Sequence, residues 1–218
     1  ETAVTGQFGA LSTDTLLVQG ADTGFSPPGS TSIKKMTEHD LEIIEKIPGI
    51  KTAIPRYLKY GKVEFNDVLG FSGVASLPSE KEKTEEVYSA LNIGTEQGRL
   101  LKADDNGKIV LGNSFISNDL FGKQIKIGSK IKVQEKDFEV VGILKSSSTF
   151  TINSAILMTE EDMKSLFEIP EGEIDFIVVR VEDENKVEQV AEEISKRLRN
   201  DRDQKKGQED FEVQTPIQ

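Results

Sequence analysis

Apolar residues recur at helical spacing in the clearest helix of this sequence, which we expect to run from Asn185 to Arg199. The apolar residues that share one face are Val187, Val190, Ala191, Ile194 and Leu198. Charged residues fill the opposite face. The pattern therefore predicts a helix with one buried side and one side in water.

Two more helices are predicted from their capping signals, a hydroxyl residue followed three positions later by an acid. One begins at Thr37, in the run TEHD, and ends at Pro48. The other begins at Thr159, in the run TEED, and ends at Pro170. A strand is expected soon after each helix, which suggests two related α-β halves; a chance similarity in capping chemistry is the alternative.

β-branched residues between turn signals predict strands along the rest of the chain. The expected strands cover residues 13–19, 51–65, 108–112, 154–158, 174–181 and 211–215. From Ile125 to Leu144 apolar and polar residues alternate, which predicts a small antiparallel sheet. Proline, glycine and polar runs predict loops at Phe25–Ser32 and Ser146–Thr149.

These elements predict an α+β fold with a discontinuous outer part. The middle of the chain, residues 67–149, has short strands separated by glycines, whereas the flanking segments have β-α-β character. We therefore expect residues 1–66 and 150–218 to form one α/β subdomain. Residues 67–149 are expected to form a β-rich insert.

Composition excludes several classes of function. No apolar run approaches the roughly 20 residues that a membrane-spanning helix needs. The net charge of -11 repels a phosphate backbone, so we expect no nucleic-acid partner. The chain has no cysteine, which removes disulfides and thiolate chemistry. It starts at Glu1 without the basic and apolar regions of a signal peptide, so it reads as part of a longer protein.

The sequence contains few residues that could act in catalysis, and we expect no catalytic, metal-binding or cofactor-binding residues. The single histidine, His39, lies in a predicted helix start among acids, where a surface role is expected. The sequence contains no GxSxG, HExxH or Walker A motif. The chain is therefore not expected to be an enzyme or to hydrolyse ATP.

Acidic runs at three places in the sequence are candidates for sites. Asp104-Asp105-Asn106-Gly107 lacks the ligand spacing of an EF-hand, so a turn is favoured over a calcium site. Glu160-Glu161-Asp162 is favoured as a helix's first turn, where the dipole attracts anions, over a general acid-base pair. Ser79–Glu86 is expected to be a solvated, partly helical surface segment, with docking as the alternative.

Glycines in the middle of the chain mark turns. They are Gly94, Gly98, Gly112, Gly122 and Gly128, and their spacing does not form a phosphate-binding fingerprint. One of them opens the segment from Gly94 to Leu144, which carries a resemblance to a known family.

That segment reads GTEQGRLLKADDNGKIVLGNSFISNDLFGKQIKIGSKIKVQEKDFEVVGIL. A GR pair precedes an acidic turn and an IVLG strand; LFG, QIKIG and FEVVGIL follow in order. This pattern resembles the MacB-like periplasmic core domain of FtsX/MacB-type ABC transporter permeases. The resemblance extends to IPGIKTAIP at residues 47–55 and to DFEVQTP at residues 210–216. The charged run 79–86 and the short spacing before Ile125 depart from the family pattern.

The resemblance implies a porter-like subdomain built from both chain ends, with a smaller inserted subdomain called Sabre. It implies a place on the extracytoplasmic side of the cell membrane, between the first and second of four membrane helices. The implied partners are a separate cytoplasmic ATPase subunit, a second permease copy, and an adaptor or other extracytoplasmic protein.

Three functions follow as hypotheses. The first is transport: the domain couples ATPase-driven movement of the membrane helices to export, through residues near Glu1–Ala10 and Thr215–Gln218. The second is a docking or signalling module that regulates a cell-wall hydrolase or senses a peptide. The third is a hydrolase with a cryptic site, for which no residue can be nominated. The acidic charge also suggests attraction of cationic peptides or divalent cations.

Overall fold

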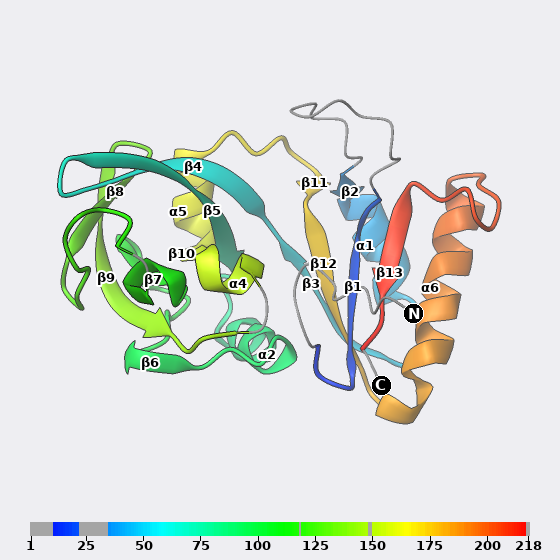
Figure 1. The fold of residues 1–218 in the computed structure, drawn as a ribbon. Helices are drawn as coiled ribbons and strands as arrows, with labels where there is room; N and C mark the ends of the chain where they lie inside the picture. The colour runs from blue at the N-terminus through cyan, green and yellow to red at the C-terminus, as the bar shows by residue number, and fades with distance from the viewer. Residues whose placement is uncertain (1–10, 22–34, 118, 148–149, 217–218) are drawn as a thin grey trace. The chain divides into compact units, whose positions relative to one another are not determined.

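The computed structural model describes residues 11–21, 35–117, 119–147 and 150–216. Its contacts divide the chain into two compact units (Figure 1). Residues 57–169 form what we call the inserted unit, and residues 11–56 with 170–216 form the terminal unit. The expected loop Phe25–Ser32, the segment Glu1–Ala10 and the last two residues lie outside the described residues, as do residues 148 and 149 of the second expected loop.

The terminal unit is built on an antiparallel sheet with the strand order β13-β1-β12-β3. Its elements are β1 (Thr15–Gly20), β2 (Met36–Thr37), α1 (Glu38–Glu45), β3 (Ile50–Arg56), β11 (Glu173–Ile174), β12 (Phe176–Val181), η1 (Glu184–Lys186), α6 (Val187–Asp201) and β13 (Phe211–Gln214). β2 and β11 pair as a separate short ribbon. Each segment of the chain that flanks the inserted unit supplies two strands of the main sheet.

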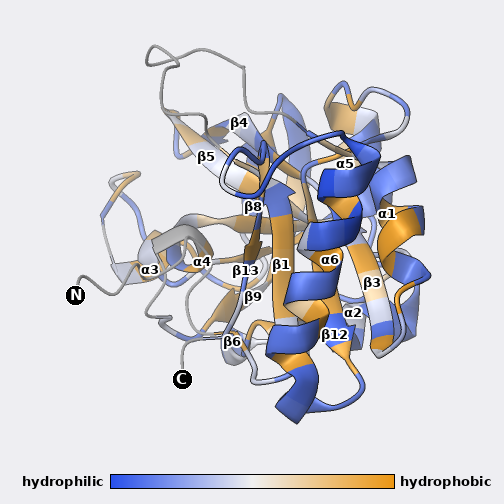
Figure 2. Ribbon diagram, turned by 90° about the vertical axis from the view of Figure 1, so that its right-hand side faces the viewer, coloured by the Kyte–Doolittle hydropathy of each residue, from blue (hydrophilic) through white to orange (hydrophobic). Residues whose placement is uncertain are grey.

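Helix α6 covers one face of this sheet with the apolar stripe that the sequence predicts. The buried residues of α6 are Val187, Val190, Ala191, Ile194 and Leu198. They pack in one core with residues of β1, β12 and α1. Figure 2 shows the hydrophilic side of α6 turned away from the sheet. The helix begins two residues later than expected because residues 184–186 form the 3₁₀ turn η1.

The two predicted capping signals differ in the structure. At α1 the hydroxyl of Thr37 accepts from the Asp40 amide, and the Asp40 carboxylate accepts from the Thr37 amide at 2.8 Å, a complete capping box. At α5 (Glu160–Leu166) the Thr159 hydroxyl caps the Asp162 amide, but the Asp162 carboxylate accepts elsewhere. Because α1 belongs to the terminal unit and α5 to the inserted unit, the two helices are not parts of equivalent α-β halves.

The inserted unit contains a seven-stranded sheet with the order β6-β9-β7-β10-β5-β4-β8. Its elements are β4 (Leu58–Phe65), β5 (Val68–Leu77), α2 (Lys81–Ala90), β6 (Thr95–Gly98), β7 (Lys108–Leu111), α3 (Ser114–Ser117), β8 (Lys130–Val133), β9 (Lys136–Leu144), α4 (Phe150–Ser154), β10 (Ile156–Thr159) and α5. β8 also pairs with β9, so the sheet closes into a ring, and β6 adds to β9 outside it.

Apolar side chains from every strand of the ring fill its interior. Examples are Val63, Ile109, Val133, Phe138 and Met158, all 1% exposed or less. The predicted alternation between residues 125 and 144 appears in β8 and in the first half of β9, whereas residues 140–144 of β9 are all buried. The ring therefore has a core of its own.

The unit boundaries differ from the expected division at residues 67 and 149. The inserted unit begins at Tyr57 because β4 pairs along its whole length with β5. It extends to Ile169 because β10 lies between β5 and β7 and closes the sheet. The expected single strand 51–65 is two strands, β3 and β4, which belong to different units.

Candidate functional site

The first and last strands of the terminal unit, β1 and β13, meet at one edge of its main sheet. β1 and β13 are antiparallel neighbours, with Leu17 opposite Gln214 and Gly20 opposite Phe211. In this register the start of β1 and the end of β13 lie at the same end of the sheet. We call this end the exit edge, defined by Asp14 and Thr215. It is the candidate functional site.

Ion pairing fixes the β1 side of the exit edge. The guanidinium of Arg180, on β12, donates from Nη2 to Asp14 Oδ2 at 2.6 Å and from Nε to Asp14 Oδ1 at 3.2 Å. The Val181 amide donates to the Asp14 carbonyl at 2.8 Å. The Thr13 hydroxyl donates to Glu184 at 2.6 Å. The bidentate pair and these two bonds hold the start of β1 against β12 and the turn that leads into α6.

A second cluster holds the far end of β13. Arg202, just after α6, donates to Asp40 and to Asp210, each at 2.7 Å. Burial tends to lower the pKa of Arg202, but the two carboxylates outweigh burial and raise that pKa above its ordinary value. Asp40 is the acid of the α1 capping box, so one residue caps a helix and binds the arginine. α1, α6 and β13 are therefore joined by one partly buried cluster.

These clusters leave no local signal in the sequence. Asp14 and Arg180 are separated by 166 residues, and Asp40 and Arg202 by 162. Arginine and aspartate at such distances look like ordinary surface charges. Only the FEVQ strand and the D before it, within the family-like run 210–216, pointed to this region.

His39 lies on the surface, as expected, and pairs with one acid. Its Nε2 is 2.8 Å from Asp201 Oδ1, and this hydrogen bond and the charge of Asp201 raise the pKa of His39 above its ordinary value. The described residues place no nucleophile in contact with it. Nor do three or more His, Asp or Glu side chains of the described residues converge as a metal site would require.

Two of the acidic runs come together in the inserted unit, which the sequence did not predict. Asp105 accepts from Arg99 at 2.6 and 3.1 Å and from the Lys102 amide at 2.7 Å. Burial works to raise the pKa of Asp105, but these hydrogen bonds outweigh it and lower the pKa. Asp162 accepts from the Gly107 amide at 2.8 Å, which ties the turn to α5. Both acids thus have structural contacts.

The other acids of α5 are engaged in the same way. Glu161 accepts from Asn106 at 3.2 Å, and Asn106 accepts from the Thr159 hydroxyl at 2.9 Å. Glu160 pairs with Lys164 one turn further along the helix. The expected surface segment Ser79–Glu86 contains the start of α2, where Lys83 lies 3.2 Å from Glu80.

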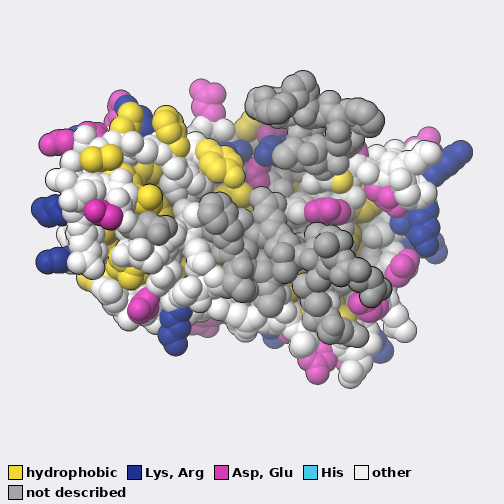
Figure 3. Space-filling model, viewed as in Figure 1, with side chains coloured by type: hydrophobic (Ala, Val, Ile, Leu, Met, Phe, Trp, Pro, Cys, Tyr) yellow, Lys and Arg dark blue, Asp and Glu magenta, His cyan; other side chains and the backbone are white. Residues whose placement is uncertain are grey.

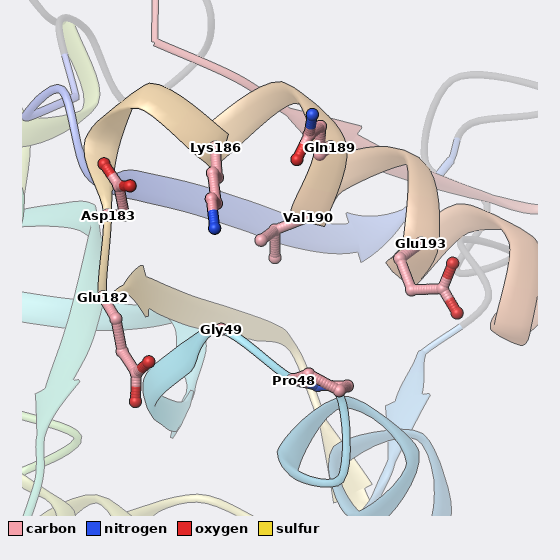
Figure 4. Close-up of a pocket in the computed structure, with 8 residues that line it drawn as sticks. All are labelled: Pro48, Gly49, Glu182, Asp183, Lys186, Gln189, Val190 and Glu193. Carbon is pink, nitrogen blue, oxygen red and sulfur yellow. The ribbon is translucent and has the colours of Figure 1, made fainter.

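A pocket of about 300 Å³ lies in the terminal unit between the turn at Gly49 and the start of α6 (Figure 4). Its lining residues are Pro48, Gly49, Glu182, Asp183, Lys186, Gln189, Val190 and Glu193. Its acids are partly engaged: Asp183 caps the Asn185 amide, and Glu193 accepts from Arg197 at 2.8 Å. The lining is mixed in charge and largely exposed.

Comparisons with known proteins identify the family. The model of the MacB-like periplasmic core domain matches residues 1–197. An uncharacterised ABC transporter permease of Methanocaldococcus jannaschii is 33% identical over 183 residues, which are 84% of this chain and 44% of the relative. The chain therefore spans less than half the length of that relative.

Two solved structures share the fold. The periplasmic region of MacB from Actinobacillus actinomycetemcomitans has a TM-score of 0.67 at 18% identity, covering 94% of this chain and 90% of that one. The extracellular domain of the noncanonic ABC-type transporter YknZ from Gram-positive bacteria has a TM-score of 0.61 at 16% identity, covering 92% and 100%. Both are mixed α and β domains like this one. Among the described residues no helix is long and apolar enough to cross a membrane. Sequence and fold together show that this chain belongs to the MacB-like periplasmic core domain family of ABC transporter permeases.

Proposed function

We propose that this domain lies on the extracytoplasmic side of the cell membrane and converts ATPase-driven movement of two membrane helices into rotation of a rigid body. Its partners in this proposal are a separate ATPase subunit, a second permease copy and an extracytoplasmic protein, an adaptor among them. The movement serves export or acts on that protein. The observation that carries the proposal is the pairing of β1 with β13 at the exit edge.

The contacts of the exit edge support this proposal. A displacement applied near Asp14 passes through the bidentate pair to Arg180 on β12, at the centre of the sheet. A displacement applied near Thr215 passes through β13 to β1. Because both inputs reach neighbouring strands of one packed sheet, the terminal unit is suited to move as a single body.

The test uses the full-length permease with its ATPase subunit in lipid nanodiscs. A spin label at Lys196→Cys, on the exposed side of α6, reports the distance between the two copies of the permease. The proposal expects that distance to change between the nucleotide-free state and the state trapped with ATP and vanadate. The chain has no cysteine of its own to compete for the label.

Flexible insertions then test whether the movement is transmitted through the two strands of the exit edge. Six glycine and serine residues inserted both between Ala10 and Leu11 and between Gln214 and Thr215 should abolish the change in distance while ATP is still hydrolysed. The same insertion between Lys205 and Lys206, in the loop before β13, should leave the change intact. Movement that survives the paired insertions, or no movement in the unmodified protein, would refute the proposal.

The alternative, a docking or signalling module, is favoured by a different observation. The inserted unit carries large apolar side chains on its exposed surface, which rigid-body movement alone does not require. The two functions are compatible, because a partner held by one unit can be moved by the other.

A further inference from the structure

The turn before β7 contains the only Asn-Gly sequence of the chain, Asn106-Gly107. The backbone nitrogen that follows an asparagine can attack the side-chain amide carbon. Glycine makes this attack easiest because it has no side chain to obstruct the approach. Figure 3 shows Asp and Glu side chains spread over the face in view, so the acids beside this turn do not by themselves mark a site. The asparagine distinguishes it.

The reaction is deamidation, and its one co-reactant is water. The Gly107 nitrogen forms a bond to Cγ of Asn106 and gives up its proton. The bond from Cγ to Nδ2 breaks, and Nδ2 leaves as ammonia with that proton. Water then opens the resulting cyclic imide at either of its carbonyl carbons. The product at position 106 is aspartate or isoaspartate, so an amide is replaced by a carboxylate and the chain gains a negative charge.

Three hydrogen bonds from the start of α5 hold both reacting groups. The Asn106 side chain donates from Nδ2 to Glu161 at 3.2 Å and accepts at Oδ1 from the Thr159 hydroxyl at 2.9 Å. The Gly107 amide donates to Asp162 Oδ2 at 2.8 Å. The group that would leave and the nitrogen that would attack are therefore bound to different residues of α5 and its cap.

The charge and the burial of these contacts oppose the attack. The Gly107 nitrogen must lose its proton to react, and the carboxylate of Asp162 beside it disfavours the negative charge that forms. Asp162 is 5% exposed and Thr159 1%, so water does not readily replace either contact. Glu161 is exposed and holds the Asn106 amide less firmly.

We propose that Asn106 is a latent deamidation site, which the start of α5 keeps unreactive and which reacts once α5 moves away from the turn. The product replaces a donor to Glu161 with a second carboxylate, so two like charges face each other where a hydrogen bond was. The modified turn therefore no longer binds α5 as before. The proposal concerns the inserted unit alone and does not rest on the proposed function.

One contact acts in the opposite direction. The Thr159 hydroxyl donates to Oδ1 of Asn106, which draws electrons from the amide carbon and on its own favours attack. If this effect outweighed the other two contacts, the folded chain would deamidate faster than a free peptide of the same sequence. The proposal expects the reverse, so a comparison of rates decides between them.

The test incubates the 218-residue chain and a synthetic peptide of residues 102–111 at mildly alkaline pH, where the amide proton is lost more readily. Trypsin cleaves after Lys102 and Lys108, so one short fragment carries Asn106, and mass spectrometry measures its conversion. The folded chain should react at least about 10-fold more slowly than the peptide, because only open conformations react. Equal rates, or a faster folded chain, would overturn the proposal.

Alanine substitutions then test the two acids that bind the turn. Asp162→Ala should speed deamidation of Asn106 about 10-fold, and Glu161→Ala about 3-fold. The matched control is Glu160→Ala, which removes the adjacent acid; Glu160 pairs with Lys164 instead of the turn, so the rate should not change.

Circular dichroism checks that each variant is folded. Glu161→Ala keeps the test decisive if Asp162→Ala does not fold, because the Glu161 side chain is exposed. Rates that the folded variants at positions 161 and 162 do not raise, or that Glu160→Ala raises equally, would contradict the protective role of α5.

Asn106→Asp stands in for the aspartate product and tests the second half of the proposal. It should melt at a lower temperature than Asn106→Ala, which loses the same hydrogen bonds without adding a charge. Adding Glu161→Ala to Asn106→Asp should recover part of that loss, since the facing carboxylate is gone. An aspartate variant that melts no lower than the alanine variant would show that the turn accommodates the product, and the proposed loss of contact would be wrong.

Discussion

Arg202 binds two carboxylates, the buried Asp40 and the partly exposed Asp210. Its guanidinium donates to Asp40 and Asp210, and Arg202 and Asp40 are nearly inaccessible to water. Removing one partner of a buried pair leaves the other charge uncompensated, which costs more than the pair itself gains.

We therefore predict that Arg202→Met destabilises the domain by about 3 kcal/mol in urea unfolding at pH 7. The matched control is Arg197→Met, which removes a half-exposed pair with Glu193 one helical turn away. The control should cost about 0.5 kcal/mol or less. Equal losses from both variants would mean that the Arg202 cluster adds nothing special to stability.

His39 gives a direct pH test because it is the only histidine in the sequence. Asp201 raises its pKa, so folding is favoured by the protonated form. This contribution is complete below the pKa of about 6.5 of an unfolded histidine. It is lost as the pH rises through the higher pKa of the folded state.

NMR titration of the single imidazole should give a pKa above 6.5, and Asp201→Asn should return it toward that value. Between the unfolded pKa and the raised folded pKa of His39, the stability of Asp201→Asn should depend less on pH than the stability of the unmodified domain. A titration midpoint that Asp201→Asn does not move would show that the 2.8 Å contact is not made in solution.

At the scale of single residues, the sequence predicted contacts between near neighbours in the chain but not contacts between residues far apart in the chain. The Thr37 capping signal is confirmed because a capping box needs only four adjacent residues. The second role of Asp40, as a ligand of Arg202, depends on the packing of α1 against the end of α6. Asp40 and Arg202 are 162 positions apart, and no local sequence pattern predicts a contact over that distance.

At the scale of elements, glycines decide how closely strands approach. The backbone of β9 at Gly142 passes so near Arg99 that an added Cβ would lie 1.9 Å from the Arg99 carbonyl oxygen. Gly98 has a φ of +67° and is similarly crowded by the Val141 carbonyl. The glycine of the FEVVGIL run therefore permits β6 to join β9.

Gly142→Ala is predicted to destabilise the domain by about 3 kcal/mol, because backbone rather than a flexible side chain would have to move. Gly94→Ala is the control, since its Cβ would meet only the Lys145 side chain at 3.6 Å. That control should be nearly neutral in thermal unfolding. Similar melting temperatures for both variants would disprove the close approach.

Sequence patterns predicted the elements of the inserted unit better than their pairing. Alternation predicted β8 and the start of β9, where one face of the strand is buried and the other is exposed. The parallel pairing of β10 with β5 joins residues about 80 positions apart and leaves no local signal. For that reason the expected insert ended before β10.

At the scale of the whole molecule, the closed ring predicts which fragment folds alone. Residues 57–169 contain every strand of the ring and its core, so we expect this fragment to unfold cooperatively in urea. The fragment 67–149 lacks β4 and β10, which opens the ring on both sides of β5. It should show no cooperative transition. A cooperative 67–149 fragment would favour the division expected from the sequence over the one described by contacts.

Family membership could be predicted from the sequence because glycines and apolar positions of one continuous segment carry the pattern. The exit edge could not be predicted from the sequence, because β1 and β13 are far apart along the chain. Only a folded sheet brings their residues to one place.

The pairing of β1 with β13 also determines which forces the domain withstands. Their outer ends, at Asp14 and Thr215, point the same way. Pulling these ends sideways, away from each other, would peel the strands apart one hydrogen bond at a time, a weak mode of resistance. Pushing or tilting both ends together loads none of those bonds. Under the proposed function, membrane helices that tilt together would preserve the pairing of β1 with β13, whereas helices that move apart would separate the two strands, starting at the exit edge.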